Sequence, residues 1–340
     1  MPGGAERLGC ASVQGLCHAL LEIGDRPTPG EAHVVAVIVN WRSTDWLLPC
    51  LDSLRLVEGP LRQVIVVENG SGDGSAARIR EWAAREGLPL SDEGETADGR
   101  DSWLVLLELT ENRGYAAGNN AGLAWARAAG AYTHLWLLNP DVIVPPTALL
   151  AMIARLKAVP SAGLCGAVLA DLDAPHQVQC IGGARFDRRM ARPHDLGAGL
   201  SLGDVEDAAF RESQLGYIMG ACCLANRAFV QAAGPMDERF FLYFEEAAWV
   251  AAAGHAFDLV VAKNAIIFHR RHAAGGRQEA YLFGNRLRYA RYYALHFLVF
   301  TMAGLIGTAL AALARGEWRR VRLLLSPRLW AYGFSLSTKP

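Results

Sequence analysis

The sequence predicts an α/β domain with a mostly parallel sheet, followed by a helical extension that associates with a membrane. The first observation is an alternation of apolar, strand-like runs with helical segments, repeated four times between residues 33 and 158. The second is a long stretch near the C-terminus, residues 294–314, that contains no Asp, Glu, Lys or Arg. The third is composition: 52% of the residues are hydrophobic and 20% are charged, so a large core can be buried.

The expected strands are short runs rich in Val, Ile and Leu, which is typical of strands buried on both faces. We expect strands over residues 33–39, 63–67, 103–109, 133–138 and 162–169. Helical spacing predicts helices over residues 46–56, 75–86, 118–128 and 146–158. Asp73 or Ser75 is placed to cap the second helix, and Pro146 lies near the first turn of the fourth. Because parallel strands end at one edge of a sheet, this alternation predicts nucleotide-binding geometry there.

The second half of the domain is less regular. An acidic surface loop is expected over residues 91–101, and residues 171–215 are expected to be rich in loops. Further strands are predicted over 217–224, 257–261 and 265–268, and further helices over 226–233 and 245–253. We therefore divide the chain into a poorly patterned segment (1–31), an α/β domain (32–275) and a helical extension (276–340).

The first segment has little pattern. Residues 11–23 could form one short helix. Its apolar run is broken by Gln14, Gly15 and His18, and no Lys or Arg leads it, so we do not interpret it as a signal peptide.

The uncharged stretch 294–314 is long enough to cross the hydrocarbon core of a bilayer. Arginines lie on both sides of it, at positions 286, 288, 291, 315, 319, 320 and 322. Arginines on both sides favour a helix or helical hairpin that lies in a cytoplasmic leaflet over a helix that spans the membrane. A true span and a core or oligomer helix remain as alternatives.

Charge and cysteine content exclude several classes. Lys and Arg number 33 and Asp and Glu 34, and a net charge of −1 argues against a nucleic-acid-binding protein. An odd number of cysteines without a C-x-x-C pair argues against a disulfide framework or a zinc knuckle. We expect free, buried thiols at positions 10, 17, 50, 165, 180, 222 and 223.

Four polar patterns fall at the ends of predicted strands. They are VNW at 39–41, VENGSGDGS at 67–75, NRGYAAGNNAG at 112–122 and LLNPD at 137–141. None is a phosphate loop of the GxxxxGK[ST] type, and none contains the dinucleotide fingerprint GxGxxG. Because alternate residues of an extended segment point the same way, Asn139 and Asp141 can both face a nucleotide.

Two further patterns lie in the second half: GACCL at 220–224 and GPMDERFFLYFEE at 234–246. Together, the order and spacing of these patterns resemble the GT-A glycosyltransferases of family 2. The likeness covers residues 34–290 and is greatest to the bacterial rhamnosyltransferase-like and galactofuranosyltransferase-like branch. It implies a GT-A (Rossmann-like) fold. It also implies an inverting transfer of sugar from a nucleoside-diphosphate sugar.

The resemblance also implies roles for individual residues. Asp141 would ligate a divalent cation, Mg²⁺ or Mn²⁺, with the late His269 as a diphosphate or metal contact. Glu246 would be the general base, with Glu245 as its partner, since adjacent carboxylates repel and raise a pKa. The implied nucleotide contacts are Asn40, Glu68, Asn69, Asp73, Arg113, Gly114, Gly118, Asn119, Asn139 and His269.

Plainer interpretations stay open at this point. Asp141 can be a turn or capping residue, Glu68 a solvated loop carboxylate and His269 a core histidine. Arg113 can be a solvated surface cation, and the Glu245–Glu246 pair an acidic helix start.

Three positions depart from the family pattern. Ala248, Ala252 and Gly284 stand where Asp, Arg and Arg are expected. These losses leave open a non-catalytic relative that binds nucleotide or glycan for assembly. A sugar-phosphate nucleotidyltransferase is disfavoured because residues 40–43 lack its Gly-rich loop with an Arg.

The resemblance leads us to expect a dTDP-rhamnose or UDP-hexose donor and a glycan or lipid-linked acceptor in envelope polysaccharide synthesis. The expected location is the cytoplasmic face of the inner membrane, in peripheral or monotopic association.

Overall fold

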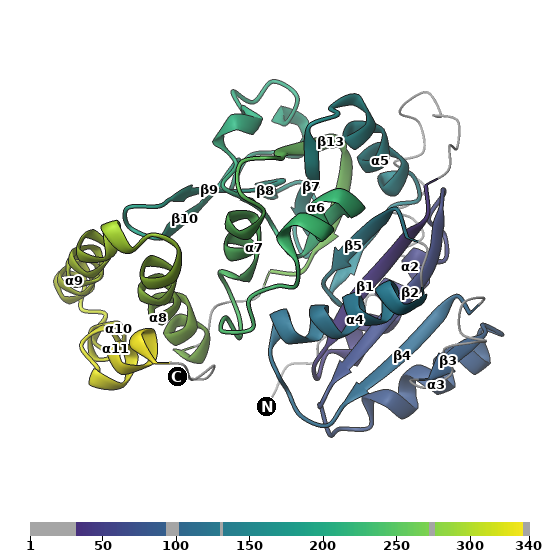
Figure 1. Ribbon diagram of the computed structural model, residues 1–340, viewed down its shortest axis with the longest axis horizontal. Coiled ribbons are helices and arrows are strands. Elements are labelled where there is room, and N and C mark those ends of the chain that lie inside the picture. The colour runs from purple at the N-terminus through teal and green to yellow at the C-terminus, as the bar shows by residue number, and fades with distance from the viewer. Residues whose placement is uncertain (1–31, 93–101, 130–131, 272–275, 336–340) are drawn as a thin grey trace.

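The computed structural model describes residues 32–92, 102–129, 132–271 and 276–335 (Figure 1). The segment 1–31, with the helix expected at 11–23, lies outside the described residues, as do Cys10, Cys17 and most of the loop expected at 91–101. The predicted boundary at residue 275 also falls outside them.

A ten-stranded sheet forms the centre of the fold, in the order β3-β4-β2-β1-β5-β12-β7-β13-β6, with β8 paired to β7. Its strands are β1 (Val34–Asn40), β2 (Leu61–Asn69), β3 (Leu90–Asp92), β4 (Leu104–Leu109), β5 (His134–Leu138), β6 (Val142–Ile143), β7 (Ala162–Asp171), β8 (Val178–Ile181), β12 (Cys222–Asn226) and β13 (Asp258–His269). The β3-β4-β2-β1-β5 run is parallel, whereas β12 is antiparallel to both β5 and β7. The predicted α/β class with a mostly parallel sheet is confirmed.

Helices cover both faces of this sheet (Figure 1). They are α2 (Thr44–Leu54), α3 (Ser75–Arg85), α4 (Tyr115–Ala129), α5 (Ala148–Ala158), α6 (Arg227–Ala233) and α7 (Glu245–Ala253). Successive residues of β1 point to opposite faces: Val34, Ala36 and Ile38 pack with α2, α3 and α5, while Val35 and Val37 pack with α4, α6 and α7.

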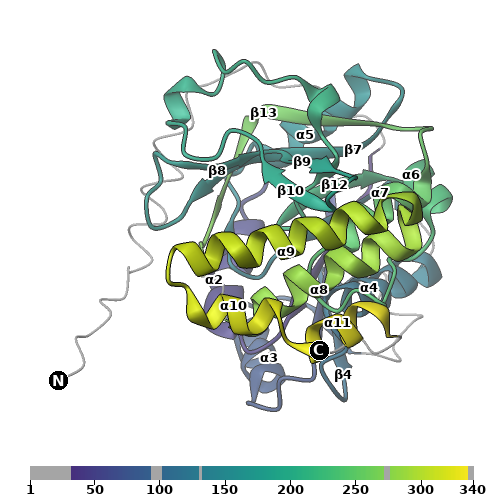
Figure 2. The same cartoon turned by 90° about the vertical axis from the view of Figure 1, so that its left-hand side faces the viewer.

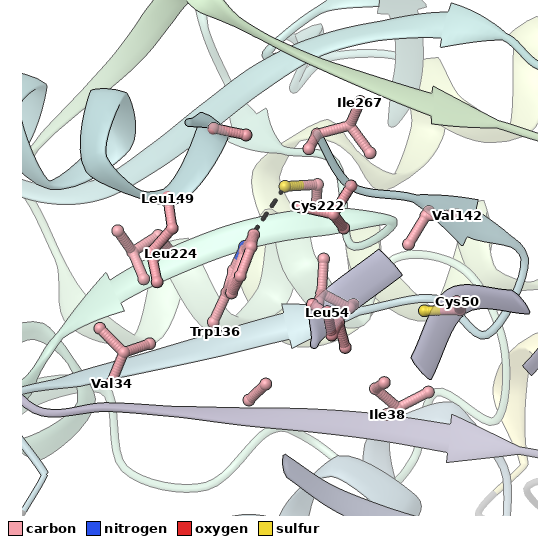
Figure 3. Close-up of a cluster of buried hydrophobic side chains, with 14 of the residues drawn as sticks. Val34, Ile38, Cys50, Leu54, Trp136, Val142, Leu149, Cys222, Leu224 and Ile267 are labelled. Atoms are coloured by element: carbon pink, nitrogen blue, oxygen red, sulfur yellow. Dashed lines mark hydrogen bonds between the residues drawn. The ribbon is translucent and has the colours of Figure 1, made fainter. Parts of the chain in front are cut away.

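Figure 3 shows part of the first of these two cores, where the Trp136 indole N–H lies 3.4 Å from the Cys222 sulfur. Among the described residues, all five cysteines are buried and free, which confirms that part of the prediction.

The segment predicted as loop, 171–215, instead contains β8, β9 (Gly183–Asp187), β10 (Arg192–Asp195) and two short 3₁₀ turns, Leu202–Asp204 and Glu212–Gln214. Strands β9 and β10 form a small antiparallel sheet with β11 (Tyr217–Ile218). The single strand predicted at 217–224 is wrong because the backbone turns between β11 and β12, where the Cys222 N–H donates to the Met219 carbonyl at 3.1 Å. The two late strands are one, β13, whose register shifts between Ala262 and Ile266.

The C-terminal stretch consists of α8 (Gly276–Tyr293), a 3₁₀ turn (Leu295–Phe297), α9 (Leu298–Ala314), α10 (Trp318–Leu324) and α11 (Pro327–Phe334). The helix predicted over 294–314 therefore begins four residues later, after the 3₁₀ turn. These helices gather at one end of the molecule, next to α7 and the β9–β10 hairpin (Figure 1). Figure 2 shows α8 and α9 running side by side, with α10 and α11 beneath them.

Candidate active site

Asp141 and His269 come together at one edge of the central sheet. Asp141 follows the carboxyl end of β5, and His269 is the last residue of β13. The Asp141 Oδ1 and His269 Nε2 atoms lie 3.6 Å apart, and the Asn139 amide nitrogen lies 3.4 Å from the same Nε2. The Arg270 N–H donates to the Asp141 carbonyl at 3.1 Å, which ties the two strand ends together. A separation of 3.6 Å is too long for a hydrogen bond, but it suits two ligands of one ion.

Gln179 of β8 fixes the orientation of the His269 ring. Its Nε2 donates to the His269 carbonyl at 2.7 Å, so the side-chain oxygen is the atom 2.8 Å from His269 Nδ1. An oxygen can only accept, and Nδ1 therefore carries the hydrogen of the neutral ring. The Nε2 lone pair then points toward Asn139 and Asp141, as in histidines that ligate metals. Sequence reasoning missed Gln179 because it lies in the segment predicted as loop.

Imidazole nitrogen and carboxylate oxygen form a suitable donor pair for a divalent cation. Within the described residues, no group of three or more His, Cys, Asp or Glu side chains is placed to hold a metal ion. The protein would therefore supply part of a coordination shell, and diphosphate and water oxygens could supply the rest, as is common for Mg²⁺.

The first two strand ends carry buried polar side chains. Both Glu68 carboxylate oxygens accept from the Ser71 backbone N–H, at 3.1 and 3.2 Å, and the Ser71 hydroxyl also donates to Glu68. Ser71 Oγ in turn accepts from the Arg42 N–H at 2.9 Å. Glu68 is buried rather than a solvated loop carboxylate, and it holds this turn closed. Asn40 is fully buried, and its Oδ1 has no hydrogen-bond partner among the described residues.

Asn69 joins β2 to the loop that precedes α4. Its side-chain nitrogen donates to Asn112 Oδ1 at 3.2 Å and to the Gly114 carbonyl at 3.1 Å, and its oxygen accepts from the Arg113 N–H at 3.1 Å. Gly114 has a φ of 92°, and a Cβ there would lie 2.5 Å from the Phe241 carbonyl oxygen. The Arg113 guanidinium is half-exposed and pairs with Glu238 at 3.1 Å. Asn69 thus shapes the loop instead of facing solvent.

The acidic pair begins α7 on the other side of the site. Glu246 Oε1 accepts from the Gly220 N–H at 3.1 Å, and the Tyr115 hydroxyl donates to the Gly220 carbonyl at 2.8 Å. A Cβ at position 220 would lie 2.5 Å from Glu246 Oε1, so glycine is required for this approach. The next residue, Ala221, accepts from the Asn139 N–H at 3.1 Å. Residues 220–221 therefore connect Glu246 with the strand end that carries Asp141.

Burial decides the proton affinity of this pair. Loss of hydration raises the pKa of Glu246, opposed by backbone N–H donors that include Gly220. Burial, and then the neighbouring Glu246, raise the pKa of Glu245 well above its usual range. Glu245 Oε2 has no hydrogen-bond partner among the described residues. Backbone N–H donors lower the pKa of both groups, but only the pKa of Glu245 is raised further by the neighbouring carboxylate, so Glu245 favours its neutral form more strongly.

Residues 35–179 match the family model described as Glycosyl transferase family 2. The chain therefore contains a glycosyltransferase family 2 domain. Its sequence is similar to proteins from two strains of Mycobacterium tuberculosis (CDC 1551 / Oshkosh and ATCC 25618 / H37Rv), each named N-acetylglucosaminyl-diphospho-decaprenol L-rhamnosyltransferase. The identity is 24% over 255 residues, which cover 68% of this chain and 74% of each relative.

Two solved structures resemble this protein in fold. One is the mannosyltransferase PcManGT from Pyrobaculum calidifontis in complex with GDP-Man and Mn²⁺, with a TM-score of 0.52, 15% identity and coverage of 96% of this chain and 93% of that one. The other is GalNAc-T7 with UDP, GalNAc and Mn²⁺, with a TM-score of 0.56, 11% identity and coverage of 86% and 60%. These likenesses show the GT-A fold.

Three further residues that the resemblance assigned to the nucleotide have structural contacts in this protein. Asp73 precedes Gly74, the N-cap residue of α3, and accepts from the Ser75 N–H at 3.1 Å. A Cβ at Gly118 would lie 2.6 Å from Val39, so this glycine lets α4 approach β1. Asn119 is buried in α4, and its side chain donates to the Tyr115 carbonyl at 3.0 Å. Their predicted contacts with nucleotide stay predictions.

Apolar packing occupies two of the three positions that depart from the family pattern. Ala248 is fully buried in a cluster with Phe240, Phe244 and Tyr289. A Cβ at Gly284 would lie 2.4 Å from the Tyr332 ring, so no longer side chain fits there. Ala252 is exposed. The protein thus holds α7 in place by packing, where the family pattern has a charged pair.

We expect Glu245→Gln to stabilise the protein increasingly as pH rises. The native pKa lies above the unfolded value of about 4.5, so the native state retains a proton that the unfolded state releases. The contribution of Glu245 to the free energy of unfolding is therefore fully present below about pH 4.5, and it falls as pH rises toward the native pKa by up to about 1.4 kcal/mol per pH unit. Glutamine does not titrate. Thermal unfolding at pH 4.5, 6 and 7.5 measures the difference.

The exposed Glu81 of α3 provides the control for this experiment. Glu81→Gln should change the melting temperature by a small amount that is the same at all three pH values. A melting-temperature difference for Glu245→Gln that does not grow with pH would show that Glu245 is charged in the native protein.

Proposed function

We propose that the protein is an inverting glycosyltransferase that moves a sugar from a nucleoside-diphosphate donor, of the dTDP-rhamnose or UDP-hexose type, to a glycan or lipid-linked acceptor. The observation that carries this proposal is the connection of Asp141 and His269 with Glu246 through residues 220–221. The mycobacterial relatives support the acceptor class, since their name specifies a sugar linked through diphosphate to decaprenol.

Asp141 and His269 would hold a divalent cation, Mg²⁺ or Mn²⁺, that when bound would neutralise the departing diphosphate. Both GT-A structures named above contain Mn²⁺ together with a nucleotide, which supports this assignment. Gln179 keeps the His269 Nε2 lone pair available to ligate the metal, because its hydrogen bond to Nδ1 sets the tautomer of the ring. Asn139 would contact the ribose region beside this pair.

Glu246 would act as the general base. The acceptor hydroxyl oxygen forms a bond to the anomeric carbon while the bond from that carbon to the diphosphate oxygen breaks, which inverts the configuration. The hydroxyl proton passes to the Glu246 carboxylate. Burial makes this carboxylate a stronger base than an exposed one, and the Gly220 N–H holds it in place.

The test of this proposal is turnover of purified protein with a panel of dTDP- and UDP-sugars, Mn²⁺ and a polyprenyl-diphospho-N-acetylglucosamine acceptor. We expect release of nucleoside diphosphate together with a product heavier by one sugar, both detected by mass spectrometry. Binding of nucleotide without turnover in any mixture would contradict the proposal and favour the non-catalytic assembly role that Ala248, Ala252 and Gly284 leave open.

We further propose that α9 binds the surface of an anionic membrane. Residues 295–314 are long and apolar enough to cross a bilayer by length and composition, but along one face they pack against α8 and α10. Leu305 and Ala309 face the other helices, whereas Val299 and Leu310 on the opposite face are 76% and 62% exposed. A helix with one packed face and one apolar exposed face is suited to lie in the plane of the membrane interface.

Charge supports the same orientation. The segment after α9 carries the exposed Trp318, which is 61% accessible, and tryptophan favours the interface between water and lipid. Exposed arginines surround it at positions 315, 319, 322 and 328. Each arginine near an anionic surface contributes about 1 kcal/mol. The acceptor class and this surface agree, since a lipid-linked acceptor lies in a membrane.

We expect the triple variant Val299→Ser, Ile306→Ser, Leu310→Ser to bind anionic vesicles about 100-fold more weakly than the wild type. Each of these exposed side chains would lose on the order of 1 kcal/mol of transfer free energy. Co-sedimentation with vesicles containing phosphatidylglycerol measures the binding. The matched control, Ala303→Ser on the same exposed face, removes little apolar area and should bind like the wild type. Equal vesicle binding by the triple variant would contradict the assignment.

A further inference from the structure

The backbone directly before the acidic pair is strained. Tyr243 and Phe244 have φ values of 68° and 78°, in the left-handed region that bulky side chains avoid. Phe244 is the N-cap residue of α7, so this turn sets where Glu245 and Glu246 begin. Residues held in this region persist only where the surrounding structure holds them. The contacts of the turn therefore decide the position of the base.

Asn285 of α8 holds this turn. Its side-chain nitrogen donates to the Leu242 carbonyl at 2.9 Å and to the Tyr243 carbonyl at 3.0 Å. Its side-chain oxygen accepts from the Tyr332 hydroxyl at 2.8 Å. Asn285 is fully buried and Tyr332 is nearly so, so water does not compete for these bonds. The Tyr332 hydroxyl fixes which end of the Asn285 amide faces the turn.

Glycines allow Tyr332 to reach this position. Besides the contact at Gly284 described above, a Cβ at Gly333 would lie 2.8 Å from the Leu287 Cβ. The two helices α8 and α11 consequently pack closely, as Figure 2 shows. The glycine that departs from the family pattern at position 284 is thus the residue that admits the Tyr332 ring.

Arg288, one helical turn after Asn285, makes a parallel connection. Its guanidinium donates to the Tyr332 carbonyl at 2.9 Å and lies 4.2 Å from the centre of the Tyr332 ring. It also donates to the Arg239 carbonyl, in the segment that leads to the strained turn. Residues three apart on a helix share a face, so Asn285 and Arg288 together join α11 to residues 239–243.

We propose that Tyr332, near the end of the described chain, is a positioning residue for the general base. It acts through Asn285 on the carbonyls of Leu242 and Tyr243, and so fixes the start of α7 and the side chain of Glu246. The role of Glu246 as base rests on the proposed function. The connection from α11 to the turn rests only on the contacts above.

Tyr332→Phe in the full chain tests the connection, because it removes one hydroxyl and keeps the ring. We expect amide hydrogen exchange of residues 242–250 to accelerate at least tenfold, with β1 and β5 unchanged. Asn285→Asp is the second variant, since a carboxylate accepts from Tyr332 but cannot donate to the two carbonyls. Tyr293→Phe is the matched control, since Tyr293 lies in α8 like Asn285 and its hydroxyl donates to Asp237 at 2.8 Å. In this variant residues 242–250 should exchange as in the wild type.

Exchange of residues 242–250 within twofold of the wild type in both test variants would overturn the proposal. Faster exchange throughout the protein would also overturn it, because that indicates a general loss of stability. The kinetic readout is a fall in kcat of about tenfold with unchanged KM for the nucleotide sugar, and an unchanged kcat would contradict positioning of the base. If the wild type turned over no nucleotide sugar, the proposed function would be wrong. The exchange experiment would still test whether Tyr332 holds the turn before α7 through Asn285.

Discussion

Glu246→Gln is expected to lower kcat by about 10³-fold while leaving the affinity for the nucleotide sugar within a few-fold of wild type. General base catalysis typically contributes 10²- to 10⁴-fold, and glutamine cannot accept the acceptor proton. Glutamine keeps the size of the side chain and its oxygen can still accept from the Gly220 N–H, so the local structure should be retained. Nucleotide release measures kcat, and calorimetric titration with the nucleoside diphosphate measures binding.

The pH dependence of the wild type provides an independent check of this assignment. Below its pKa Glu246 is protonated and cannot accept a proton, so kcat should fall on the acid side of the profile. Burial raises that pKa, so the fall should be centred above the value of about 4.5 usual for glutamate. Glu81→Gln, remote from the site, should retain the wild-type rate and profile. Full activity of Glu246→Gln would assign the base elsewhere.

Asp141→Asn is expected to weaken Mn²⁺ binding in the presence of nucleoside diphosphate by at least about 100-fold. The Asp141 carboxylate is the anionic one of the two proposed metal ligands, and a neutral amide oxygen is a much poorer ligand for a hard cation. The stabilisation that Mn²⁺ adds to nucleotide binding should disappear, because ligand binding to the native state raises the melting temperature. Titration of Mn²⁺ followed by electron paramagnetic resonance measures the free ion directly.

Two variants complete the Asp141 experiment. His269→Ala should weaken Mn²⁺ binding by a smaller factor, since it removes a neutral donor. Asp173→Asn is the control, since it changes an exposed carboxylate two residues after the end of β7. This variant should bind Mn²⁺ as the wild type does. Unchanged Mn²⁺ affinity in Asp141→Asn would remove this residue from the metal site.

The central sheet could be predicted because its inner strands are continuous apolar runs. Strands β1, β2, β4, β5 and β7 each carry that signal, and each lies within a few residues of its predicted position. The small sheet could not be predicted. Its strands are two to five residues long and include polar residues such as Arg185 and Asp187, so they carry no periodicity. Tertiary pairing alone makes them strands.

The predicted site residues at strand and helix ends lie together because parallel strands end at one edge. Asp141 and His269 are distant in sequence, yet their side chains lie 3.6 Å apart. The contacts that hold the site residues in place left no local signal, although Tyr115 and Gly220 each lie in one of the patterns described above. Tyr115 and Gly220 are 105 positions apart, and Gln179 and His269 are 90 apart. Contacts of this kind depend on packing of the whole domain, and no motif or spacing predicts which residues make them.

A crystal structure with Mn²⁺ and a nucleoside diphosphate, with data recorded at the manganese absorption edge, would locate the cation relative to Asp141, His269 and Glu246. We expect one strong anomalous peak within about 2.3 Å of an Asp141 oxygen and of His269 Nε2. The diphosphate should contact that peak, and in the nucleotide-sugar complex the donor sugar should lie between the diphosphate and the Glu246 carboxylate. A manganese peak at any other place, or a nucleotide bound away from Asp141 and Glu246, would contradict the proposed active site.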